Sequence, residues 1–285
     1  MIEPYPNKNL TPFLRWTGSK RWFTKDYLKN FLPEKFNNFH EPFLGAGAVF
    51  FYLKSQNKDL HRQFYLSDTN SDLINCYSQL KGDANAVIKF LSQYKNTEKD
   101  YYAIRASNPE GLSEQAARFI YLNRTSFNGI YRVNSNGVYN VPYGKRHNVD
   151  IVTERLLQEI QLLLNGSTLS NRSFEKSIDD IKEGDLVFID PPYTTAHENN
   201  GFIEYNQILF SWEDQLKLKE YIVKIIEKKA FFILTNASHH SLLDLYNNLA
   251  NIQKISRLSK VGGRNKTRGI YNELVIYNTN ENYGQ

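Results

Sequence analysis

The feature that most constrains the fold is a short apolar run, Leu186–Ile189, followed directly by Asp190-Pro191-Pro192-Tyr193. This run begins just after the turn signal Glu183-Gly184-Asp185, which predicts a central parallel strand covered on both faces. Ligands bind at the carboxyl edge of open α/β sheets. The strand is therefore expected to deliver the carboxylate of Asp190 to a binding edge.

The residues after this strand favour a particular kind of ligand. Pro191 and Pro192 remove two backbone donors and stiffen the turn. A carboxylate, free carbonyls and the ring of Tyr193 remain, and they suit a planar group that carries an NH2. The alternative is a proline turn whose Asp190 only caps the next helix.

The composition argues against several classes of protein. The single cysteine, Cys76, permits no intrachain disulfide and no zinc cluster built on thiolates, so no metal is predicted and a reducing, cytoplasmic compartment fits. The sequence has no N-terminal signal segment and no run of about 20 apolar residues, which argues against secretion and membrane spanning. The net charge of +5 allows a polyanion partner without requiring one.

Two loops near the N-terminus are candidates for ligand binding. Phe13–Lys20 precedes a helix predicted over residues 21–31, and it can present backbone N–H groups and Lys20 to an anion or be a solvated turn. Residues 40–47 predict a strand that runs into Gly45 and Gly47 and opens a helix, as in dinucleotide-binding loops.

Asp68 stands at the end of a second predicted strand, over residues 64–68, about 20 residues after the glycine loop. A carboxylate at this place can bind ribose hydroxyls. It can equally cap the helix that follows through Tyr77.

Residues 76–165 interrupt the α/β alternation, with a helix predicted over Ser113–Asn123. Ile130–Asn134 and Val138–Val141 predict two strands of a hairpin joined across Ser135-Asn136-Gly137. Residues 119–149 contain four cations and no acid. The hairpin can therefore enter a DNA major groove, or it can be a solvated hairpin whose rings pack on the main body.

The α/β pattern returns after Leu169. A capping-box start at Ser211–Asp214 predicts a helix. Further elements are expected at residues 230–235 (strand), 241–249 (helix), 252–258 (strand) and 271–277 (strand). Between the last two strands, Lys254–Arg268 carries six cations and no acid, so it is either a phosphate clamp or a solvated loop.

These motifs, in this order, resemble the N6-adenine DNA methyltransferases of the Dam-like alpha group over nearly the whole chain. Phe13–Lys20 is similar to the family's N-terminal cofactor motif, Glu41–Gly47 to its glycine loop and Asp68–Ile74 to its acidic motif. Asn123–Gly144 is similar to the target-reading hairpin, and Asp190–Tyr193 to the catalytic motif.

The resemblance implies a Rossmann-like methyltransferase sheet with helices on both faces, formed by residues 1–75 and 166–285. It also implies an inserted helical target-recognition domain over residues 76–165 that carries the β-hairpin. The implied cofactor is S-adenosyl-L-methionine, and the partner is double-stranded DNA with a flipped adenine. The implied cofactor residues are Trp16, Lys20, Phe43, Gly45, Gly47, Asp68 and Asp190.

In the family, the Asp190-type side chain and the Pro191-type carbonyl accept hydrogen bonds from the adenine amine. The Tyr193-type ring stacks on the flipped base, and Pro192 completes the catalytic motif. When the side chain and the carbonyl accept both N–H bonds, the amine lone pair is drawn out of conjugation with the adenine ring. Proximity, alignment and charge placement would then account for the acceleration of the reaction.

Candidate DNA-binding residues come from the resemblance and from the charge pattern. They are Arg15, Arg124, Phe127, Asn128, Ile130, Arg132, Pro142, Arg146, Arg264 and Lys266. Arg132 is the candidate for reading a guanine, with Ile130 and Pro142 against a thymine methyl. GATC is the leading target, but Lys145-Arg146-His147, where many relatives have a Tyr, leaves another GA-containing site open.

Rival interpretations remain. A companion restriction endonuclease is compatible with the resemblance, and the sequence carries no signal for oligomeric state. A nicotinamide-dependent oxidoreductase could use the glycine loop, but it leaves Asp190–Tyr193 without a role. An amine methyltransferase acting on RNA or protein would not need the hairpin, and an inactive or regulatory DNA-binding module would not need Asp190. Methyl transfer to DNA separates these classes.

Overall fold

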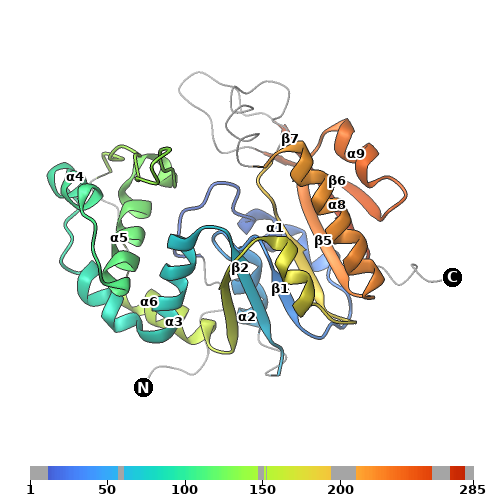
Figure 1. Cartoon of the computed structure of the whole chain (residues 1–285), viewed down its shortest axis with the longest axis horizontal. Helices are drawn as coiled ribbons and strands as arrows, with labels where there is room; N and C mark the ends of the chain where they lie inside the picture. Colours follow the sequence, from blue (N-terminus) through green and yellow to red (C-terminus); the bar gives the residue numbers. More distant parts are fainter. Residues whose placement is uncertain are drawn as a thin grey trace. The chain divides into compact units, whose positions relative to one another are not determined.

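The computed structural model describes residues 12–56, 61–146, 151, 153–193, 210–258 and 270–279. Within these ranges, seven strands form one sheet in the order β3-β2-β1-β4-β5-β7-β6 (Figure 1). The strands are Phe39–Glu41 (β1), Phe64–Asp68 (β2), Ser167–Asn171 (β3), Leu186–Ile189 (β4), Phe231–Ala237 (β5), Asn251–Leu258 (β6) and Ile270–Tyr277 (β7).

The sheet is largely parallel. The pairs β2–β3, β1–β4 and β4–β5 are parallel, whereas β7 runs antiparallel to β5 and β6. The strand order reverses direction between β1 and β4, which makes this the topological switch point of a doubly wound sheet. The predicted Rossmann-like α/β class is confirmed.

By internal packing the chain divides into two compact units. The first comprises residues 1–27 and 44–172, and the second residues 28–43 and 173–285. The first unit holds the helices α1 Arg21–Asp26, α2 Ala48–Gln56, α3 Ser71–Leu91, α4 Glu98–Ala106, α5 Leu112–Thr125 and α6 Glu154–Leu164, with the 3₁₀ turn η2 Phe127–Gly129. The second holds η1 Leu28–Asn30, η3 Phe174–Asp180, α8 Trp212–Glu227 and α9 His240–Tyr246. The assignment of target recognition to residues 76–165 stays a prediction.

In the first unit, α3 contacts both α5 and α6, while α4 contacts α5 and α1 contacts α2. The α3 helix begins where the side chain of Asn70 accepts the backbone N–H of Leu73 at 3.0 Å. Its buried residues Leu73, Tyr77, Leu80 and Ala84 recur every three or four positions, so they form one apolar face. This face fixes α5, the helix that leads into the predicted hairpin.

The predicted hairpin is an antiparallel ribbon without two regular strands. Across residues 126–146, the pairing is limited to the bridges Val133–Tyr139 and Ser126–Tyr143. The side chain of Asn134 accepts the backbone N–H groups of Asn136 and Val138. These bonds close the turn of the ribbon. Backbone bonds also cross it from Asn134 to the carbonyl of Val138 and from Asn140 to that of Arg132, but the expected strands 130–134 and 138–141 do not form a regular ladder.

The predicted helix over residues 21–31 is also shorter than expected. The α1 helix ends at Asp26 because Tyr27 leaves the helical region, with φ at −131°. A 3₁₀ turn, η1, follows, in which Leu28 is fully buried. The apolar residues that predicted a longer helix therefore extend beyond the end of α1 into this 3₁₀ turn.

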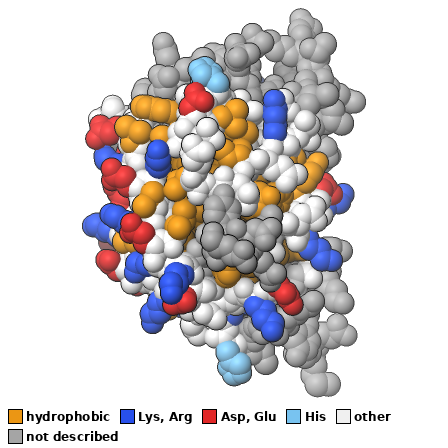
Figure 2. All heavy atoms as spheres, turned by 90° about the vertical axis from the view of Figure 1, so that its right-hand side faces the viewer, with side chains coloured by type: hydrophobic (Ala, Val, Ile, Leu, Met, Phe, Trp, Pro, Cys, Tyr) orange, Lys and Arg blue, Asp and Glu red, His pale blue; other side chains and the backbone are white. Residues whose placement is uncertain are grey.

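The second unit is built on a large apolar core. Val187 and Ile189 of β4 and Phe232 and Leu234 of β5 contribute to this core, together with buried residues of α8 and α9. The capping box predicted at the start of α8 is confirmed, since Ser211 and Asp214 bond to each other's backbone N–H groups. Figure 2 shows hydrophobic side chains exposed among charged ones on the side of the molecule that carries α9.

In the part of the chain that the structure describes, we find no helix with the length and apolar character needed to cross a lipid bilayer.

Candidate active site

Asp190 lies at the edge of the sheet where β1 and β4 end, which is the switch point. The four residues of β4 are all buried, so the strand is firmly held in the core. The carboxylate Oδ1 of Asp190 accepts a hydrogen bond from the hydroxyl of Thr235 on β5 at 2.8 Å. Asp190 itself remains partly exposed. Its carboxylate is thus oriented by a buried partner and can still reach a ligand.

The rest of the tetrapeptide lies close to the same edge. Pro191 is buried and Pro192 is exposed, while Tyr193 is partly exposed. The hydroxyl of Tyr193 donates to Oε2 of Glu273 on β7 at 2.6 Å. Asp190 does not cap α8, because Ser211 caps that helix.

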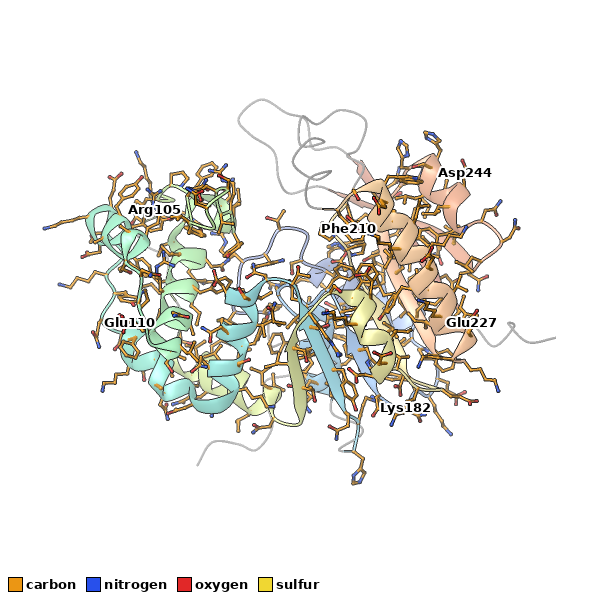
Figure 3. The ribbon with its side chains drawn as sticks, in the orientation of Figure 1. Arg105, Glu110, Lys182, Phe210, Glu227 and Asp244 are labelled. Atoms are coloured by element: carbon orange, nitrogen blue, oxygen red, sulfur yellow. The ribbon has the colours of Figure 1, made fainter. Side chains whose placement is uncertain are left out.

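Phe43 follows β1 and adds an aromatic wall to the second unit. Its ring stacks on Phe174, with centroids 5.3 Å apart. It also meets the ring of Phe210, which is labelled in Figure 3, edge-on at 5.9 Å. Phe43 is only partly buried. These rings therefore form an apolar surface on this side of the switch point, against which an apolar part of a ligand can pack.

In the first unit, the glycine loop is tied to the end of β2. Gly45 and Gly47 have φ angles of +47° and +64°, a region that favours glycine. The backbone N–H of Leu44 donates to the carbonyl of Ser67, and that of Gly45 donates to Oδ2 of Asp68 at 3.0 Å. The loop and the acid thus form one structure.

Asp68 is not the cap of α3, because Asn70 fills that position. Its Oδ1 accepts the backbone N–H of Asn70 at 2.9 Å. Burial raises the pKa of Asp68, and this effect outweighs the backbone hydrogen bonds, which lower it. A carboxylate has about four acceptor positions, so Asp68 beside a glycine loop can accept hydrogen bonds from the hydroxyls of a ribose.

Trp16 packs directly against the glycine loop. A Cβ added to Gly45 would lie 2.9 Å from Cδ1 and Nε1 of the Trp16 indole. The indole also stacks on the ring of Tyr131 in the ribbon, with centroids 6.0 Å apart, and lies near the ring of Phe119 on α5, with centroids 6.4 Å apart. Lys20 is buried, and its Nζ donates to the carbonyl of Gly18. Trp16 therefore joins the predicted cofactor loop to the predicted DNA-reading ribbon.

A buried amide connects the N-terminal motif to the turn at the start of the ribbon. The side chain of Asn123 accepts the backbone N–H of Arg15 at 2.8 Å and donates to the carbonyl of Arg15 at 2.6 Å. The side chain of Arg15 lies against Gly129, where an added Cβ would stand 2.5 Å from Cβ of Arg15. Between them, Phe127 and Asn128 are exposed, and Asn128 has a left-handed φ of 55°.

Other candidate DNA residues differ in how far they are engaged. Arg132 is exposed, and its Nε donates to Oδ1 of Asn140 across the ribbon at 2.7 Å. The guanidinium of Arg124 instead donates to the carbonyls of Ile151 and Phe13. Arg146 donates to the carbonyl of Ser126. DNA contacts by these residues stay predictions.

The remaining predicted DNA residues have simple placements. Ile130 is partly buried and its carbonyl accepts the hydroxyl of Tyr139, whereas Pro142 is exposed and its carbonyl accepts the N–H of Phe127. Arg264 and Lys266 lie outside the described residues.

Sequence reasoning missed four residues that hold the site: Asn123, Tyr131, Thr235 and Glu273. One signal was available for Glu273, an acid within the otherwise largely apolar run Tyr271–Tyr277. A buried carboxylate in such a strand requires a hydrogen-bonding partner. Thr235 gave a weaker signal, as a polar residue that ends an apolar strand.

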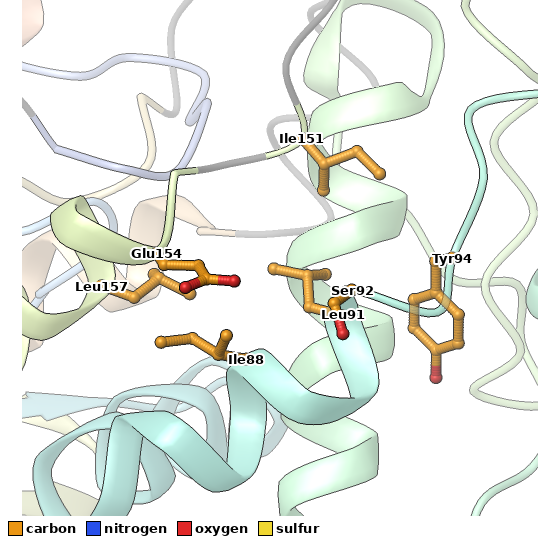
Figure 4. A pocket seen from close by; sticks show the side chains of 7 residues that line it. All are labelled: Ile88, Leu91, Ser92, Tyr94, Ile151, Glu154 and Leu157. Carbon is orange, nitrogen blue, oxygen red and sulfur yellow. The ribbon is translucent and has the colours of Figure 1, made fainter.

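A shallow pocket of about 230 Å³ lies elsewhere, between the end of α3 and the start of α6 (Figure 4). It is lined by Ile88, Leu91, Ser92, Tyr94, Ile151, Glu154 and Leu157. None of the predicted site residues lines it, and nothing in its mainly apolar lining selects a ligand.

Comparisons with known proteins give a consistent result. A sequence model of the family described as D12 class N6 adenine-specific DNA methyltransferase matches residues 16–261. The type II methyltransferase M1.LlaDCHI of Lactococcus lactis subsp. cremoris is 37% identical over 280 residues, covering 95% of this chain and 96% of its own. The type II methyltransferase M.MjaIII of Methanocaldococcus jannaschii is 32% identical, covering 94% and 98%. The DNA adenine methylase of Escherichia coli is 30% identical, covering 81% of each chain.

Proposed function

The chain belongs to the D12 class of N6 adenine-specific DNA methyltransferases, and we propose that it acts on an adenine flipped out of a short duplex site, with S-adenosyl-L-methionine as methyl donor. As a member of this class, it is an adenine-specific DNA methyltransferase. We take GATC as the leading target.

The observation that carries the proposal is the position of Asp190 at the switch point, directly after β4. Ligands bind at this place in open α/β sheets. The hydroxyl of Thr235 fixes the carboxylate there, and Tyr193 offers a ring three residues on. A carboxylate, a carbonyl and a ring are the groups needed to hold a planar base that carries an amine.

The residues proposed to hold the cofactor are Trp16, Lys20, Phe43, Gly45, Gly47, Asp68 and Asp190. Asp68 would accept hydrogen bonds from the ribose hydroxyls, while it also keeps the N–H of Gly45 in place. When bound, the cofactor supplies an electrophilic methyl group on a sulfonium sulfur.

In the proposed mechanism, the chain's own residues orient the amine. Asp190 and the carbonyl of Pro191 accept its two N–H bonds, which directs the nitrogen lone pair out of the plane of the base. The ring of Tyr193 stacks on the adenine, and Pro192 stiffens the turn. Alignment and charge placement then lower the barrier.

Target recognition is proposed for residues 76–165. The exposed Phe127 and Asn128 would enter the duplex beside the target, and Arg132 would read a guanine through its guanidinium. Ile130 and Pro142 would contact a thymine methyl. Further contacts are proposed for Arg15, Arg124, Arg146, Arg264 and Lys266.

A companion restriction endonuclease is part of the same proposal, because two of the relatives carry type II names. So is a cytoplasmic location, where the DNA substrate would be found.

The test is the transfer of labelled methyl groups from S-adenosyl-L-methionine to unmethylated genomic DNA, followed by single-molecule sequencing. We expect N6-methylated adenines in one short motif, which also reads out the target. The variant Asp190→Ala is expected to remain folded, to keep much of its DNA affinity and to lose transfer. Modification at a position other than adenine N6, or full activity in this variant, would overturn the proposal.

A further inference from the structure

We propose that Thr235 of β5 and Glu273 of β7 are positioning residues that together hold the two ends of the catalytic tetrapeptide. We call this pair the β5–β7 brace. Thr235 donates to Asp190, and Glu273 accepts from Tyr193. The inference rests on the proposed function, since it concerns the orientation of the groups that would hold the adenine.

The register of the sheet places both brace residues on one face. β5 and β7 are antiparallel, with Ala237 opposite Glu273 and Thr235 opposite Val275. Residues opposite each other share a face, as do residues two apart in one strand. Thr235 and Glu273 are therefore diagonal neighbours on the face of the sheet opposite to Leu234.

The burial of the brace argues for a role beyond stability. Thr235 is 0% exposed and Glu273 is 1% exposed. Removing a carboxylate from water is costly, and a well-packed apolar residue at such a position is often as stabilising or more so. The next three residues of β7, Leu274 to Ile276, are apolar and buried. A carboxylate at position 273 is thus not required by the sheet.

The contact with Tyr193 has the geometry of a charge-assisted bond. Its length of 2.6 Å lies in the range of about 2.5–2.7 Å expected for a hydroxyl that donates to a carboxylate. Because the hydroxyl oxygen lies on the long axis of the ring, this bond fixes the direction of that axis and the position of the ring. A ring held in position is ready to stack before the base arrives, which reduces the ordering needed at that moment.

Thr235 acts at the other end of the tetrapeptide. Its hydroxyl donates to one oxygen of Asp190, which fixes the rotamer of the carboxylate. A carboxylate has about four acceptor positions, so this bond leaves capacity for the amine. The brace thus sets the acceptor and the stacking ring by means of two paired strands.

The test for Glu273 is a double-mutant cycle with Tyr193→Phe and Glu273→Gln, measured as kcat and as KM for S-adenosyl-L-methionine. We expect each single change to lower kcat about tenfold, with little change in that KM. The double variant should be no worse than the worse single variant, because the same contact is lost. Multiplicative losses in kcat, or wild-type kcat in a folded Glu273→Gln variant, would overturn the role of Glu273.

The test for Thr235 compares Thr235→Val with Thr235→Ser. Valine keeps the shape and removes the hydroxyl, whereas serine keeps the hydroxyl. We expect kcat to fall about tenfold with valine and to be largely restored with serine. Equal activity of both variants would overturn the role of Thr235.

Base flipping gives a second readout, through the fluorescence of 2-aminopurine placed at the target position. The Tyr193→Phe and Glu273→Gln variants are expected to change this signal at saturating enzyme, and an unchanged signal would count against the brace. If the wild-type protein transfers no methyl group to DNA, the proposed function fails instead. A failure of the brace alone leaves the wild-type enzyme active.

Discussion

The carboxylate of Asp68 accepts the backbone N–H of Gly45 at 3.0 Å, so the acid at the end of β2 holds the glycine loop in place. We expect Asp68→Ala to weaken binding of S-adenosyl-L-methionine by about 10- to 150-fold, since bonds to a charged group contribute about 1.5–3 kcal/mol. Calorimetric titration measures this affinity. As a control, Asp244→Ala on α9 should bind the cofactor as the wild type does, and equal affinity of the two variants would contradict the role of Asp68.

The pH dependence of cofactor affinity follows from the same carboxylate. Burial raises the pKa of Asp68, and the ionised form is the one that accepts the ribose hydroxyls. Affinity should therefore fall on acidification at a pH above the ordinary titration range of an aspartate, which lies near about 3.9. Titrations at several pH values check this, and Asp68→Asn should remove the dependence. A pH profile shared by the wild type and Asp68→Asn would point to another group.

Gly45 is a position in the predicted cofactor loop where a side chain is poorly tolerated. Its φ of +47° disfavours other residues, and an added Cβ would lie 2.9 Å from the indole of Trp16. We expect Gly45→Ala to reduce cofactor affinity at least tenfold, because Trp16 or the loop must shift. Gly82→Ala is the matched control. A Cβ added at Gly82 meets nothing within 4 Å, so this variant should bind the cofactor as the wild type does. Similar affinities for the two variants would show that the close approach is unimportant.

Local sequence signals predicted the elements that carry the site. The run before Asp190 is four apolar residues after a turn, and the capping box at Ser211 is encoded within four positions, so both were readable. The contacts that orient the site were not readable in this way. Asn123 meets Arg15 from 108 residues away, and Thr235 meets Asp190 from 45 residues away. Such pairs depend on how strands and helices pack.

Charge patterns have a similar limit. An acid-free ribbon suggested that its arginines face DNA, but a charge count does not show where a guanidinium points. The guanidinium of Arg124 bonds two backbone carbonyls, whereas Arg132 lies exposed beside Asn140. The two arginines look alike in the sequence and differ in their surroundings.

Arg132 should therefore act on the choice of site. We expect Arg132→Ala to reduce discrimination between the target and a site altered at one base pair by about 1–3 kcal/mol. Its anchor Asn140 should have a smaller effect in the same direction when changed to alanine. Discrimination is measured as the ratio of kcat/KM on two oligonucleotides, one with the target and one with the altered site. As a control, Arg155→Ala should leave this ratio unchanged, because Arg155 is an exposed arginine of α6 paired with Glu159. A loss with Arg132→Ala that is equal for all sequences would make Arg132 a phosphate contact.

Asp185 anchors the opposite end of β4, and its role is in stability. Its carboxylate accepts bonds from the backbone of Asn38 and Lys182 and from Nε2 of His40 at 2.8 Å. Burial by itself raises the pKa of Asp185, but these hydrogen bonds outweigh it and hold the pKa below its ordinary value. We expect Asp185→Asn to lower the free energy of unfolding by about 1.5–3 kcal/mol at neutral pH.

The sign of the pH dependence follows from this lowered pKa. The stabilisation is fully present above the pKa of Asp185 in the unfolded chain, near about 3.9, and is lost as the pH falls through the lower folded value. Urea unfolding at pH 7 and across the acid range should show the difference between the wild type and Asp185→Asn shrinking on acidification. Glu183→Gln, which removes an exposed carboxylate 3.9 Å from Lys229, should change little at either pH. A difference for Asp185→Asn that is constant with pH would mean that packing, and not the charge of Asp185, holds this end of the strand.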